Sequence, residues 1–78
     1  MNMPARTIEV HPLRLFAQAA HARMMADHGM GLARNAGTVR SIAAEYALDG
    51  VRTWAQLADR LAPIADDIRA QLDARAAD

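Results

Sequence analysis

The chain contains no cysteine, which excludes disulfide bonds and thiolate metal sites. It also lacks lysine, so that arginine supplies every basic side chain, and nine acidic residues balance nine basic ones. No apolar run is long enough to cross a membrane, and no signal-peptide core follows residues 1–5. The sequence therefore predicts a cytoplasmic protein that does not enter a membrane.

Large side chains are also scarce, since the 78 residues include one Trp, one Tyr and one Phe, and much of the 53% hydrophobic fraction is alanine. Burying one large apolar side chain contributes about 1.5–3 kcal/mol, against an ordering cost of about 1–2 kcal/mol per residue. A domain of this size with so few large side chains has a marginal core. We predict one domain over residues 1–78 that is completed by homodimerisation or by a partner.

The charge is unevenly distributed along the chain. Residues 1–40 carry five arginines against two acids, a net +3, whereas residues 41–78 carry four arginines against seven acids, a net −3. Such a dipolar chain could pair head to tail with itself or steer an oppositely charged partner. An ordinary solvated surface explains the asymmetry equally well.

The first helix is predicted over residues 12–28, after a flexible arm at 1–7 that has no periodicity. His11 is placed to cap it, Pro12 suits the first helical position, and Gly29 suits the stop.

Two apolar stripes follow at helical spacing. The stripe that we predict to face the core is Leu13, Phe16, Ala17, Ala20 and Met24. The alanine-rich stripe, which would let another helix approach closely, is Leu15, Ala19, Ala22 and Ala26.

The middle of the chain allows two interpretations. Either a loop closes at Gly37 and Thr38 caps a short helix over 39–48, or one helix spans 31–48 and includes the glycine. An interior glycine costs about 1 kcal/mol relative to alanine, less than a broken apolar stripe would cost. We therefore favour the longer helix.

The last helix is predicted over residues 53–76, because Thr53 and Gln56 form a capping box ahead of an apolar stripe. Pro63 interrupts this stripe, so the helix is expected to be kinked or split there. Together the three segments predict an all-α fold, a small antiparallel three-helix bundle.

No arrangement of residues indicates catalysis, since no nucleophile lies at a suggestive spacing from a base. His21 and His28 share a helix face but lie seven residues apart, about 10 Å along the axis, too far for one metal ion. We expect no enzyme activity, no cofactor and no metal.

A repeated Thr-x-x-x-(Ile/Leu)-Ala pattern across residues 38–62 resembles the first helix of a helix-turn-helix. The alternative function is thus a helix-turn-helix DNA-binding transcriptional regulator. Its expected DNA-binding residues are Arg40, Arg52, Gln56 and Arg60. The acidic second half of the chain, which repels phosphate, argues against this alternative.

The leading hypothesis is a small non-enzymatic regulator or inhibitor that acts by protein–protein binding as a homodimer. Short proteins of this kind are common in phages and mobile elements, and the sequence is compatible with such an origin. Polar and methionine side chains on the first helix and at its exit suit an adaptable partner surface. The expected partner-binding residues are Arg14, Gln18, His21, Met25, His28 and Met30.

Overall fold

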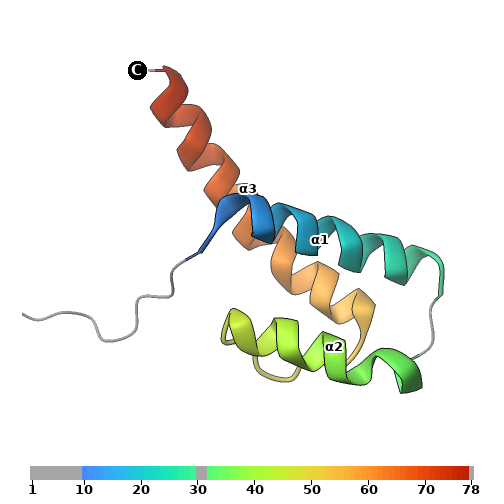
Figure 1. The fold of residues 1–78 in the computed structure, drawn as a ribbon. Helices are drawn as coiled ribbons and strands as arrows, with labels where there is room; N and C mark the ends of the chain where they lie inside the picture. The colour runs from blue at the N-terminus through green and yellow to red at the C-terminus, as the bar shows by residue number, and fades with distance from the viewer. Residues whose placement is uncertain (1–9, 30–31, 78) are drawn as a thin grey trace, which may run out of the picture.

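The computed structural model describes residues 10–29 and 32–77, apart from the side chains of residues 32–35. Within these ranges the chain forms three helices and no strand: α1 (Pro12–Asp27), α2 (Leu32–Glu45) and α3 (Trp54–Ala77) (Figure 1). The all-α prediction with three helices is therefore confirmed. The predicted arm at residues 1–7 lies outside the described residues.

Both ends of α1 are closed by local hydrogen bonds. The His11 backbone is extended, and the Nδ1 atom of its ring accepts from the Arg14 amide at 3.4 Å, while Pro12 occupies the first helical position. At the other end, Gly29 has φ +62° and its amide donates to the Ala26 carbonyl at 3.1 Å. A left-handed residue just past the last turn is the commonest helix stop, and glycine adopts it without a steric penalty.

A single helix, α2, runs through Gly37. This agrees with the longer of the two helices that the sequence allowed. Helix α2 ends at Glu45, however, three residues before the predicted end at residue 48. The cause is Ala47, whose φ of +54° turns the chain into the left-handed region. Its amide donates to the Ala44 carbonyl at 3.1 Å, and the Leu48 amide donates to the Ala43 carbonyl at 2.8 Å. This pair of bonds is the Schellman motif.

We expect the substitution Ala47→Gly to raise the free energy of unfolding by about 1 kcal/mol, because a left-handed backbone costs an alanine roughly 1–2 kcal/mol. Chemical denaturation of both proteins measures the difference. The control is Ala70→Gly, an exposed change in the interior of α3 that should lower stability by about 1 kcal/mol. Equal effects at the two positions would contradict this account of the α2 stop.

The capping box predicted for α3 is present. The Gln56 amide donates to Oγ1 of Thr53 at 3.0 Å, and Oε1 of Gln56 accepts from the Thr53 amide at 3.2 Å and from the Arg52 amide at 2.8 Å. Pro63 lies inside α3 and does not split it. Because proline has no N–H, the Asp59 carbonyl has no intrahelical donor.

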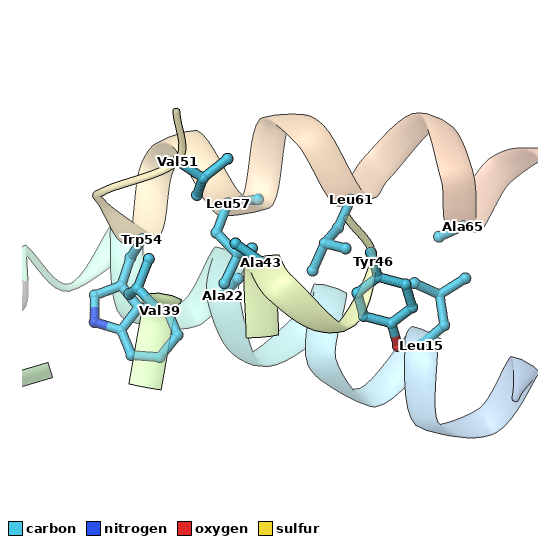
Figure 2. Close-up of a cluster of buried hydrophobic side chains, with 11 residues drawn as sticks. Leu15, Ala22, Val39, Ala43, Tyr46, Val51, Trp54, Leu57, Leu61 and Ala65 are labelled. Carbon is cyan, nitrogen blue, oxygen red and sulfur yellow. The ribbon is translucent and has the colours of Figure 1, made fainter. Parts of the chain in front are cut away.

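The helices are not all antiparallel. The His21 ring lies 5.2 Å from the Trp54 ring, and the Arg69 guanidinium lies 4.7 Å from the Phe16 ring, so α1 runs antiparallel to α3. In contrast, α2 and α3 run in the same direction, and the segment 46–53 leads the chain back along α2 (Figures 1 and 2). The antiparallel arrangement that we predicted therefore holds for α1 only. The resulting molecule is flat, with extents of 43 × 31 × 15 Å.

The core lies where the three helices and the returning segment meet (Figure 2). Its buried side chains are Leu15, Ala22, Val39, Ala43, Tyr46, Val51, Trp54, Leu57, Ala58, Leu61 and Ala65. This list corrects the prediction for the first helix. The alanine-rich stripe faces the core, and its Leu15 and Ala22 are fully buried. In the other stripe, Leu13 is 73% exposed and Met24 is 49% exposed. Small side chains let α3 approach α1 closely. Of the stripe that we predicted to face the core, Phe16 is partly buried against it, and the other four residues are exposed.

Candidate interaction surfaces

The face of α1 that we predicted to bind a partner is turned in part toward α2. Nε of Arg14 donates to Oε2 of Glu45 at 2.6 Å, and Nη2 donates to Oε1 at 3.1 Å. Nε2 of Gln18 donates to the same Oε1 at 3.1 Å, and the Tyr46 hydroxyl donates to Oε1 of Gln18. These four residues form a polar cluster that joins the start of α1 to the end of α2.

The electrostatics of this cluster follow from the paired charges. The hydrogen bond from Arg14 holds the pKa of the Glu45 carboxyl below its ordinary value, and the same bond and the Glu45 charge raise the pKa of Arg14. Burial raises the pKa of the Tyr46 hydroxyl. Glu45 was not among the expected site residues. The sequence pointed to Glu45 in one way, since it is the only acidic residue between Asp27 and Asp49 and so the only carboxylate in that stretch with which an arginine could pair.

We expect Glu45→Gln to reduce the loss of stability in acid. A carboxyl whose folded-state pKa lies below its ordinary value, 4.5 for Glu45, stabilises the fold above that value and loses this contribution as the pH falls through the folded-state pKa. The free energy of unfolding should therefore fall more steeply below about pH 5 in the wild type than in the variant. The difference is small, since the pair is exposed. Denaturation at a series of pH values measures it, and parallel curves would contradict the pairing.

The other residues predicted to bind a partner make contacts of their own. His21 meets the edge of the Trp54 ring at an interplanar angle of 90°, and Met25 is half-buried against the core. Nδ1 of His28 lies 2.8 Å from the Met24 carbonyl at the end of α1. Met30 lies outside the described residues.

A different face of α1 is open. Leu13, Ala17, Ala20 and Met24 recur at helical spacing on the side opposite the buried Leu15, and all four are exposed. We call these four residues the outer face of α1. It is a charge-free apolar strip, and within the described part of the chain it contains two of the most exposed large apolar side chains.

The residues expected to bind DNA lie around one segment, the loop before α3. Arg40 and Arg52 line a hollow of about 570 Å³ together with Ala36, Gly50 and Val51. A neighbouring hollow of about 240 Å³ also includes Gly50 and Val51, and its remaining lining residues are Gln56, Asp59 and Arg60. We call the larger one the loop hollow. The structure therefore gathers these arginines, which the sequence left scattered.

The connection between α2 and α3 differs from a helix-turn-helix. Residues 46–53 separate the two helices, whereas the motif uses a turn of about three or four residues and sets its helices at a steep angle. The shared direction of α2 and α3 also differs from that geometry (Figure 1). The repeated threonine pattern thus begins a helix only at Thr53, since Thr38 lies inside α2.

Among residues 10–29 and 32–77, no three His, Asp or Glu side chains gather as metal ligands. None of the three helices in the described ranges combines the length and the apolarity that a membrane crossing requires. Comparison of the chain with protein-family models, curated proteins and solved structures found no match in any of the three.

Proposed function

We propose that the protein is a small non-enzymatic regulator or inhibitor that acts by binding another protein through the outer face of α1. The supporting observation is the 73% exposure of Leu13 and the 49% exposure of Met24 at the two ends of this face. Full burial of an exposed large apolar side chain is worth about 1.5–3 kcal/mol, so coverage by a partner returns most of this value at Leu13 and about half of it at Met24. Ala17 and Ala20 lie between them, so a partner helix can approach closely along the middle of the face.

The residue spacing also supports a homodimer as one form of this binding. The four residues are spaced by four, three and four, with large side chains at the ends and alanines in the middle. A twofold axis between Ala17 and Ala20 would set Leu13 against Met24 of a second copy, and each Ala17 against an Ala20. A dimer interface must be self-complementary in this way. The contact is a single helix face, so we propose a weak, concentration-dependent dimer.

The test compares the wild type with the double variant Leu13→Asp/Met24→Asp, which places charges on the outer face. Sedimentation velocity over a range of concentrations should show a rising mass for the wild type and a monomer for the variant. Affinity capture from the native host should recover a protein with the wild type and lose it with the variant. The double variant Ala55→Asp/Ala70→Asp, two exposed changes on α3, is the charge-matched control. Identical masses and identical captured proteins for all three would contradict the proposal.

The alternative, a DNA-binding regulator, is supported by the position of Arg40, Arg52, Gln56 and Arg60 around one loop. Duplex binding that weakens steeply with salt would favour it, because each neutralised phosphate releases counterions. A mobility-shift assay at low and high salt measures this. Without retardation at low salt, the alternative is lost.

A further inference from the structure

The loop hollow is distinctive because its two arginines come from different elements. Arg40 lies on α2, and Arg52 lies in the loop that precedes α3. Within the described part of the chain, neither guanidinium has a hydrogen bond or an ion pair. The partners of four other arginines are known: Glu45 for Arg14, Asp59 for Arg23, the Asp49 carbonyl for Arg60, and the Phe16 ring for Arg69.

The electrostatic surroundings of the loop hollow favour an anion. Its described lining residues include two guanidinium groups and no carboxylate. The N-terminus of α3, a helix of 24 residues, begins one residue after Thr53, beside Arg52, and its dipole adds positive potential at this end. The nearest acid in the loop is Asp49, which is not among the described lining residues of the loop hollow and whose backbone carbonyl accepts from Nη1 of Arg60 at 3.1 Å.

We propose that the loop hollow binds a phosphate group, carried either by a small phosphorylated ligand or by a nucleic acid strand. A guanidinium presents a planar fork of N–H donors that matches two phosphate oxygens. Two such forks from different elements can engage different oxygens of one tetrahedral phosphate, and a phosphate group with a charge of about −1.5 to −2 balances two guanidinium charges better than a carboxylate with a single charge. The volume of about 570 Å³ exceeds a single phosphate, so the rest of the ligand lies over Ala36 and Val51.

This site is independent of the outer face of α1, and its test uses separate variants. Inorganic pyrophosphate and a short DNA duplex are titrated into the ¹⁵N-labelled full chain, with sodium chloride at equal ionic strength as the reference. We expect saturable shifts of the Gly50, Val51 and Arg52 amides and of the Arg40 side-chain Nε. The double variant Arg40→Gln/Arg52→Gln should weaken binding at least tenfold. Arg75→Gln, which removes an exposed positive charge at the end of α3, should leave binding within twofold.

The two titrations also identify the source of the phosphate. Saturation by pyrophosphate but not by the duplex assigns a small phosphorylated ligand, and tighter binding of the duplex at the same residues assigns nucleic acid. Shifts that match those with sodium chloride would overturn the proposal, as would equal weakening by Arg75→Gln. Circular dichroism shows whether each variant is folded. If an Arg→Gln variant is unfolded, the corresponding Arg→Lys variant replaces it. Lysine keeps the positive charge but lacks the planar fork of donors, so binding should still be weaker than in the wild type.

Discussion

We expect Leu61→Ala to lower the free energy of unfolding by about 2–5 kcal/mol, which is among the large losses that truncation of a core side chain produces. Leu61 is fully buried in the middle of α3 and faces both α1 and α2 (Figure 2). Alanine there removes the transfer energy of the missing carbons and leaves a cavity that the rigid helices cannot fill. A domain of 78 residues has a total stability of only about 4–12 kcal/mol. The substitution should therefore remove a large share of the total stability and lower the melting temperature.

The matched control for this prediction is Leu72→Ala, the same chemical change on the same stripe of the same helix. Leu72 is 37% exposed and belongs neither to the core nor to the side chains packed against it, so its truncation should cost less than about 1 kcal/mol. Urea denaturation of the three proteins gives both values. Equal losses at the two positions would mean that Leu61 is not the centre of the core.

The largest gain is expected from Pro63→Ala. Proline inside a helix costs about 3 kcal/mol relative to alanine, because it removes one hydrogen bond and crowds the preceding turn. Proline also restricts the unfolded chain, which offsets about 0.4–1 kcal/mol of that cost. The net result should be an increase in stability of about 2 kcal/mol. Pro63 is exposed, so its replacement leaves no cavity.

A second substitution at position 63 separates two contributions to this gain in stability, the restored backbone hydrogen bond and the helix propensity of the new residue. Pro63→Gly restores the N–H that the Asp59 carbonyl lacks but adds the flexibility of glycine, so its gain should be about 1 kcal/mol smaller. Hydrogen exchange at position 63 should be slow in both variants. If both variants are less stable than the wild type, then the local geometry at Pro63 is needed to fit α3 against its neighbours.

The helix starts were predictable from local chemistry. The capping residues His11 and Thr53 act within three residues of themselves, and the structure shows both bonds. The early end of α2 was not predictable, because the left-handed position is filled by Ala47, a residue that seldom adopts it. Local sequence patterns also could not predict the direction of α2 relative to α3, because this direction depends on the path of the segment 46–53.

The buried face of α1 could not be chosen from the sequence for a physical reason. Both stripes are apolar, so periodicity identifies the two faces without ranking them. The choice depends on how closely α3 can approach, and the alanines Ala19, Ala22 and Ala26 permit the closer contact. The same limit applies to the candidate surfaces. The bond between Arg14 and Glu45 joins residues 31 apart, and the arginines of the loop hollow meet only once the chain has folded.

The packing of α1 against α3 has a consequence for the order in which the chain can fold. The first helix buries its inner face mainly on the last one, so the core joins two distant parts of the sequence (Figure 1). Contacts between residues so far apart in the sequence form only at the cost of the entropy that the intervening chain loses when the loop closes. During synthesis, α1 therefore lacks its main packing surface until most of α3 has left the ribosome.

Truncated chains make this order measurable. A chain of residues 1–50 lacks α3, and we expect it to show no cooperative thermal transition by circular dichroism. A chain of residues 1–70 retains every buried residue of the described ranges, and the described residues that it loses, 71–77, are exposed, so it should unfold cooperatively. A cooperative transition in the shorter chain would show that α1 and α2 fold together without waiting for the third helix.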